Sequence, residues 1–231
     1  MGRRDLVDEH EGSTRAHSRR FLPAALVAAV AAALGCPADD GAARIDAAAP
    51  VDAAAMAGAS AAPSTAFDLQ GNPVDPLAVA DAEIVVLTFV TPDCPLSNRY
   101  APELARIAAS VPADRVAWWL VYPDPDVDAA QIEAHRREFA LPGTPLRDPG
   151  HVLVARAFAV VTPEVAVFRR GGGTATLMYR GRIDDRVPEF GRARPEPTRR
   201  ELVDGLDAVL AGRAVAVSSA KAVGCPIGDL R

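Results

Sequence analysis

The sequence predicts an α/β fold in which a central mixed sheet is flanked by helices. Its strongest signal is the run 84–90 (IVVLTFV), which is almost wholly apolar and stops at Thr91-Pro92, as a parallel strand buried on both faces should. A helical pattern, a second β-rich run and a second helical pattern follow, and this alternation implies parallel strands joined by right-handed crossovers. A hairpin near the end adds antiparallel strands to the sheet.

Each element is justified by its periodicity and by its start and stop signals. Two capping boxes are expected, at Asp128 with Gln131 and at Thr198 with Glu201, and Gly212 ends the last helix. In chain order we expect a strand and turn at 67–73, a strand at 84–90, a helix at 96–111, a strand at 115–122, a helix at 128–139, a short helix at 151–158, hairpin strands at 165–168 and 174–179, and a helix at 198–212.

Composition and charge exclude some functions. The chain has 231 residues and a net charge of −5, without a cluster of basic residues, so we expect no nucleic-acid partner. Its three cysteines, Cys36, Cys94 and Cys225, are too few for a disulfide scaffold and are spaced wrongly for a zinc site. Each cysteine therefore needs its own explanation, and no cofactor is expected.

Residues 1–36 are predicted to be a signal peptide. The stretch 21–35 is apolar apart from Pro23 and is too short to span a bilayer comfortably, which is typical of the apolar core of a secretory signal. It ends in Ala33-Leu34-Gly35-Cys36, which resembles a bacterial lipobox. We therefore expect Cys36 to be lipidated and to anchor an exported protein to a membrane at the periplasmic face of the cell envelope. The alternative is an ordinary signal peptide with an incidental cysteine.

The rest of the chain divides into three parts. Residues 37–66 are rich in Ala, Asp and Pro and are predicted to be a disordered linker, because nothing in them can bury a core. Residues 67–212 carry all the predicted elements and form the expected domain, and residues 213–231 form a C-terminal tail.

Cys94 is the best candidate for a reactive residue. It lies where the central strand gives way to a helix, and Pro95 suits the first helical position. A thiolate at a helix N-terminus is stabilised, so we expect a lowered pKa for Cys94. The neighbouring Asp93 opposes this effect, whereas the Ser97 hydroxyl is able to donate a hydrogen bond to the thiolate. The alternative is a buried structural cysteine.

The residues around Cys94 resemble the redoxin superfamily. Cys94-Pro95-Leu96-Ser97, followed by Pro102, is similar to the thioredoxin active-site helix, with Ser97 in place of the second cysteine. Thr91-x-x-Cys94 is similar to the motif around the peroxidatic cysteine of peroxiredoxins, which have a proline where this chain has Leu87. The resemblance spans about 67–212 and implies a thioredoxin fold and a thiol-dependent oxidoreductase with Cys94 as its nucleophile.

Two distant residues are candidates for roles beside Cys94. The same resemblance implies that the Thr162-Pro163 bond is cis and that Pro163 faces Cys94. Cys225 is then a candidate resolving thiol, because a nucleophile without a partner in its own motif needs a second thiol to complete a redox cycle. A tail cysteine without a role is the alternative.

The substrate is left open between a peroxide and a protein disulfide, with a thiol as electron donor. A peroxidase is expected to position peroxide with Thr91 and a cation such as Arg99, whereas a disulfide exchanger needs a second cysteine nearby.

A binding module without turnover, holding copper or a partner protein, is the other candidate class. Copper chaperones of this fold use C-x-x-x-C and a distal histidine, and this chain has Asn98 at the second cysteine position. Cys94, Cys225 and His151 remain a possible Cu(I) set, since thiolates are soft ligands. For His135 and His151 themselves, solvated or capping roles are expected.

Overall fold

The computed structural model describes residues 66–79 and 81–228. The predicted signal peptide, the linker and Cys36 lie outside these ranges. None of the helices within them is long and apolar enough to cross a membrane.

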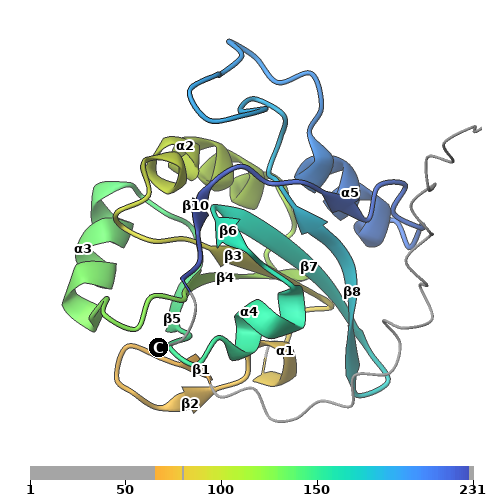
Figure 1. Ribbon diagram of the computed structural model, residues 1–231. Coiled ribbons are helices and arrows are strands. Elements are labelled where there is room, and N and C mark those ends of the chain that lie inside the picture. The colour runs from red at the N-terminus through yellow and green to blue at the C-terminus, as the bar shows by residue number, and fades with distance from the viewer. Residues whose placement is uncertain (1–65, 80, 229–231) are drawn as a thin grey trace, which may run out of the picture. The chain divides into compact units, whose positions relative to one another are not determined.

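The described part of the chain forms a mixed sheet in the order β2-β1-β5-β4-β3-β7-β8-β9, with β6 and β10 paired beside it (Figure 1). The elements are β1 (Ala66–Phe67), β2 (Pro73–Val74), α1 (Pro76–Val79), β3 (Ile84–Phe89), α2 (Pro95–Ser110), β4 (Val116–Tyr122), α3 (Ala129–Glu138), β5 (Thr144–Arg147), α4 (Val152–Ala157), β6 (Val161–Thr162), β7 (Glu164–Gly171), β8 (Thr174–Gly181), α5 (Glu201–Leu210), β9 (Ser219–Ala220) and β10 (Cys225–Pro226).

Strand β3 is the centre of the sheet, as the sequence predicts. It pairs in parallel with β4 and antiparallel with β7, and all six of its residues are buried. Its one polar side chain, Thr88, accepts a hydrogen bond of 2.9 Å from Trp118 Nε1, so the hydroxyl is buried without losing its partner. The strand therefore gives the Cys94 junction a rigid base.

Helices cover both faces of the sheet. Side chains alternate along β3, so that Ile84 and Val86 pack with α2, α3 and α5, while Val85 and Leu87 pack on the other face with α1 and α4. Two apolar cores result. This arrangement confirms the predicted α/β class, with a central mixed sheet flanked by helices.

The helix starts confirm one predicted capping box and correct the other. The Asp128 side chain accepts from the Gln131 N–H, and the Gln131 side chain accepts from the Asp128 N–H, each at 2.8 Å. In contrast, α5 begins at Glu201 without a side-chain cap. The Thr198 hydroxyl instead donates to Asp185 at 2.5 Å, so a tertiary hydrogen bond replaces the predicted local one.

Several short strands, among them β5, β9 and β10, have no counterpart among the predicted elements. β5 contains Pro145 and is only four residues long, yet it pairs in parallel with β4. β9 and β10 lie in the segment after Gly212, where the sequence shows no pattern. β9 runs parallel to the end of β8, and β10 is antiparallel to β6. The described part of the tail, residues 213–228, therefore contributes strands that pair with β8 and β6.

The excursion between β8 and α5, residues 186–199, is held by Asp185. This buried carboxylate accepts hydrogen bonds from Thr198 N at 2.7 Å and Arg199 N at 3.0 Å, and it contacts the Arg194 guanidinium. Burial alone raises the pKa of Asp185, but these donors outweigh burial and lower the pKa to about 2. Asp185 therefore stays ionised and fixes both ends of the excursion.

We expect Asp185→Asn to lower the free energy of unfolding by about 1–3 kcal/mol, because an amide cannot accept from all of these donors. The folded pKa lies below the ordinary 3.8, so the stabilisation is present above that value and disappears as the pH falls towards about 2. Urea unfolding at several pH values measures this difference. Glu189→Gln is the matched control, since the ion pair between Glu189 and Arg192 is 63% and 76% exposed. An equal effect of both changes contradicts the role of Asp185.

Candidate active site

Cys94 lies at the junction predicted for it, at the N-cap of α2 with Pro95 at the first helical position. Its side chain is 0% exposed. The thiol donates a hydrogen bond of 2.9 Å to the carbonyl oxygen of Thr162, on the chain segment that leads into β7. Pro102 lies inside α2, as the resemblance to the thioredoxin helix implies.

The segment opposite Cys94 carries the expected proline. The Thr162–Pro163 bond is cis, which confirms that expectation. Glu164, the first residue of β7, is buried and accepts hydrogen bonds from Val160 N at 2.8 Å and Val161 N at 3.3 Å. A strand residue thus fixes the loop that faces the thiol.

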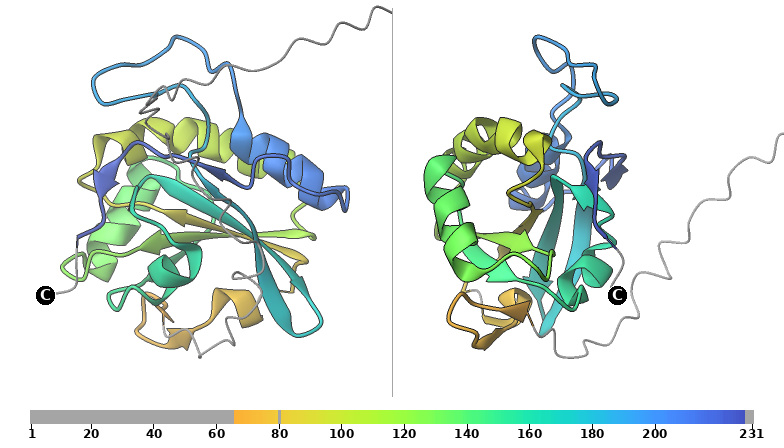
Figure 2. Two further views of the ribbon diagram at one scale, coloured as in Figure 1. Left: turned by 45° about the vertical axis from the view of Figure 1, so that its right-hand side comes forward. Right: turned by 60° about the vertical axis from the view of Figure 1, so that its left-hand side comes forward.

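Residues 213–228, which we call the C-terminal strap, lead from α5 past the end of β8 to β6 (Figures 1 and 2). In the β10–β6 pair, Cys225 lies opposite Thr162, and Ile227 N donates to Val160 O at 3.0 Å. Gly224 permits this close approach, because a Cβ atom on it would meet the Thr162 carbonyl oxygen at 2.2 Å. The strap therefore places Cys225 beside Cys94.

The two thiols have opposite pKa shifts. Burial opposes ionisation of Cys94, but hydrogen bonds from the Cys225 side chain, from Ser97 and from the Cys225 backbone hold the pKa of Cys94 below its ordinary value. This direction agrees with the sequence expectation. The pKa of Cys225 is raised to about 11. Burial is the largest cause, and the hydrogen bond and charge interaction with Cys94 raise the pKa further. At neutral pH, Cys94 is the more readily ionised thiol of the pair.

Ser97 occupies the position of the missing second cysteine. Its side chain is 0% exposed, and within the described residues its hydroxyl oxygen has no hydrogen-bond partner while Cys94 is a thiol. The Ser97 N–H and hydroxyl both favour the ionised form of Cys94. Ser97 is thus a buried donor that finds its acceptor when the thiolate forms.

Other residues named from the sequence lie farther from this chemistry. The Thr91 carbonyl accepts from Cys94 N at 3.2 Å, and its side chain faces a neighbouring pocket. Arg99 is exposed on α2. His151 directs Nε2 to the Pro123 carbonyl at 3.0 Å, and among the described residues no three His, Cys, Asp or Glu side chains are grouped to hold a metal ion. The Cu(I) set proposed from the sequence is therefore not assembled.

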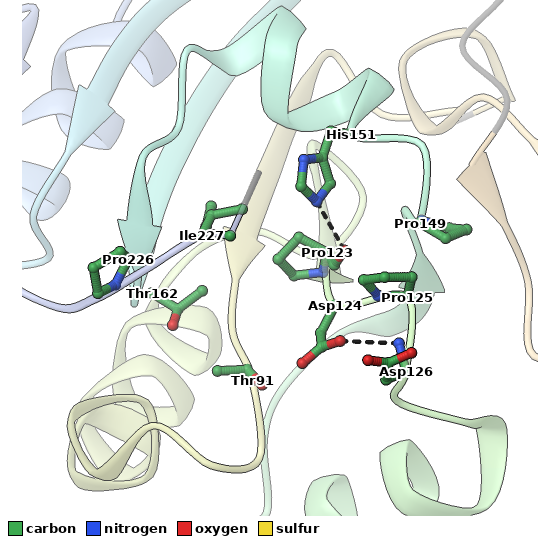
Figure 3. A pocket seen from close by; sticks show the side chains of 11 residues that line it. Thr91, Pro123, Asp124, Pro125, Asp126, Pro149, His151, Thr162, Pro226 and Ile227 are labelled. Atoms are coloured by element: carbon green, nitrogen blue, oxygen red, sulfur yellow. Dashed lines mark hydrogen bonds between the residues drawn. The ribbon is translucent and has the colours of Figure 1, made fainter. Parts of the chain in front are cut away.

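A pocket of about 480 Å³ opens beside the strap (Figure 3). Thr162, Pro226 and Ile227 lie along one side of it, and Pro125 and Asp126 lie across from them. Thr91, three residues before Cys94, and Thr162, whose carbonyl accepts from the Cys94 thiol, both line the pocket.

The sequence did not predict a buried polar chain behind Cys94. His135 was expected to be solvated or to cap a helix, but it is only 3% exposed. Its Nδ1 lies 2.9 Å from the Tyr122 hydroxyl, and its Nε2 lies 2.7 Å from Asn98 Oδ1. Asn98 Nδ2 in turn donates to the Pro92 carbonyl at 3.1 Å. The only signal was the position of His135 three residues after Ile132, on the buried face of α3.

Together, the parallel β3–β4 pair, the β7–β8 hairpin, the closing helix α5 and a cis Thr162–Pro163 bond whose Thr162 carbonyl contacts a cysteine at a helix start define a thioredoxin fold.

No protein-family model matches the chain, and no curated protein matches it. Among solved structures, a hypothetical protein from Sinorhizobium meliloti is similar at 21% identity and a TM-score of 0.55, covering 71% of this chain and 91% of that one. An uncharacterized conserved protein from Geobacillus kaustophilus is similar at 23% identity and a TM-score of 0.57, covering 73% and 90%. A secreted Mycobacterium tuberculosis disulfide oxidoreductase homologous to E. coli DsbE has 25% identity and a TM-score of 0.43, covering 63% and 96%. The first two likenesses concern the fold alone.

We expect Gly224→Ala to expose Cys94, because the added Cβ clashes with the Thr162 carbonyl and displaces β10 from β6. The rate of Cys94 alkylation at one pH, followed by mass, should rise relative to the unchanged protein. Gly228→Ala is the matched control, since a Cβ at Gly228 meets nothing within 4 Å. Equal alkylation rates in all three proteins contradict a strap that covers the thiol.

Proposed function

We propose that the protein is a thiol-disulfide oxidoreductase in which Cys94 is the nucleophile and Cys225 is the resolving thiol. The observation that carries this proposal is the register of β10 on β6, which sets Cys225 beside the buried Cys94 thiol. Both cysteines are present as thiols. Cys225 thereby supplies the second thiol that the helix motif lacks at Ser97.

The proposed cycle has two exchange steps. The Cys94 thiolate attacks one sulfur of a substrate disulfide, so that a mixed disulfide forms and the first substrate thiolate leaves. The Cys225 thiolate then attacks the Cys94 sulfur, which forms the Cys94–Cys225 disulfide and releases the second substrate thiolate. Each departing thiolate takes up one proton, the substrate gains two electrons and the protein loses two. A separate thiol electron donor returns the pair to the reduced state.

The pKa shifts support this order of attack. Cys94 has the lowered pKa and reacts first, because the thiolate is the nucleophile. Two of the causes that raise the pKa of Cys225 are its hydrogen bond to Cys94 and the charge of Cys94. Both vanish when Cys94 enters a mixed disulfide. The resolving thiol therefore becomes easier to ionise at the step that needs it.

A protein disulfide suits the site better than a peroxide. The hydrogen bonds that favour the Cys94 thiolate come from Ser97 and Cys225, whereas Arg99, the cation suggested for a peroxidase, lies exposed on α2. The pocket beside Thr91 and Thr162 offers space for the part of a partner that flanks its disulfide.

Oxidised glutathione is the probe for this function. In a Cys36→Ser background, one equivalent should produce a Cys94–Cys225 disulfide in non-reducing peptide maps. Cys225→Ser should accumulate glutathione on Cys94, since the resolving step is lost, and Cys94→Ser should remain unmodified. The proposal fails if Cys94 is oxidised while Cys225 stays open to alkylation and no internal crosslink appears. A much faster reaction with one equivalent of hydrogen peroxide favours a peroxidase instead.

We also propose that the protein is exported and anchored at the periplasmic face of the cell envelope through lipidated Cys36. The apolar stretch 21–35 and the Gly35-Cys36 pair support this proposal. An oxidising compartment also suits a domain whose two remaining thiols are held together.

We expect Cys36→Ser to move the protein from the membrane fraction to the soluble fraction of the cell envelope, because the change removes the site of acylation. Fractionation followed by immunoblotting measures the distribution, with Cys225→Ser as the control for loss of a thiol as such. An unaltered distribution of the Cys36 variant rejects the anchor.

A further inference from the structure

We infer that His135 is a positioning residue for Cys94, acting through Asn98 on the segment 92–94. The inference rests on the proposed role of Cys94 as nucleophile and adds a residue to the machinery around it. Its basis is the buried chain of hydrogen bonds from β4 through α3 to the start of α2.

The chain has only one consistent arrangement of protons. The Pro92 carbonyl can only accept, so the Asn98 amide nitrogen faces it and Asn98 Oδ1 faces His135. Because Oδ1 accepts, His135 Nε2 must carry the proton, and Nδ1 of the neutral ring then accepts from the Tyr122 hydroxyl. Every polar atom in the chain therefore has its partner while His135 is neutral.

Packing and burial keep the imidazole in this state. The ring makes edge contacts with Tyr122 at a centroid distance of 5.7 Å and with Phe139 at 5.3 Å. Burial lowers the pKa of His135, and the carboxylates of Glu138 on its own helix and Asp93 on the Cys94 segment oppose that shift. A proton on Nδ1 also removes the acceptor of the Tyr122 hydroxyl, which is buried. Neutral His135 is thus a fixed donor towards Asn98.

Asn98 transmits this constraint to the thiol. Its backbone N–H donates to the Cys94 carbonyl at 3.2 Å, and its side chain holds the Pro92 carbonyl two residues before the thiol. The segment is therefore tied at both sides of Cys94 to the first turn of α2. Since Ser97 lies in the same turn, the clamp fixes the thiol relative to donors that stabilise its thiolate.

Two substitutions at position 135 test whether His135 acts on Cys94 through its hydrogen bonds or only fills space in the core. Glutamine has a donor group (its NH₂) and an acceptor group (its carbonyl oxygen), as the neutral imidazole has a donor and an acceptor nitrogen, so His135→Gln can keep the clamp. His135→Leu fills space without hydrogen bonds. The full chain carrying Cys36→Ser, with ¹³C-labelled cysteine, is titrated by NMR so that the pKa of Cys94 is read directly. This readout requires no disulfide formation, so it stands apart from the test of the redox cycle.

We expect the pKa of Cys94 to rise in His135→Leu and to return towards the unchanged protein's value in His135→Gln, although both variants lose the packing of the ring. In the unchanged protein, ring ¹⁵N shifts should report the neutral form protonated on Nε2. The inference is overturned if the leucine variant leaves the pKa of Cys94 unchanged, or if glutamine raises it as much as leucine does.

Discussion

The site depends on one peptide group, the carbonyl of Thr162. Its oxygen accepts a hydrogen bond of 2.9 Å from the Cys94 thiol. The strap passes so close to this oxygen that position 224 has no room for a side chain. The same carbonyl therefore contacts both the Cys94 thiol and the strand that carries Cys225. Glu164 holds the preceding loop from within the sheet, so this carbonyl is fixed by the core.

Placing the second thiol on a strand instead of the next turn of α2 has chemical consequences. The interaction between the two cysteines lowers the pKa of Cys94 and raises the pKa of Cys225. In the proposed cycle, the order of attack follows from this contact. Cys94 is fully buried and the strap pairs with β6 beside it, so we expect the segment that carries the second thiol to restrict access to the first.

The fold could be predicted where local pattern and tertiary packing agree. β3, α2 and the capped start of α3 are set by long apolar runs and by caps within a few residues. β5 and β10 could not be predicted, because each is short, contains proline and is defined by its neighbour in the sheet. Thr198 shows the same limit, since a buried carboxylate distant in sequence competes successfully for its hydroxyl.

The candidate site divides in the same way. Cys94 and the Thr162–Pro163 pair stand out in the sequence, because a cysteine at a strand-to-helix junction and a proline before a strand are local features. Asn98 does not stand out in the sequence. It is noticeable there only because it occupies the position of the second cysteine in the C-x-x-x-C motif of copper chaperones. In the structure its amide joins α3 to the segment before Cys94, and an amide can do so because it donates and accepts at once, as a thiolate cannot. Asn98, which stands where the copper-binding motif has its second cysteine, is therefore the residue that we infer to hold the Cys94 segment in place.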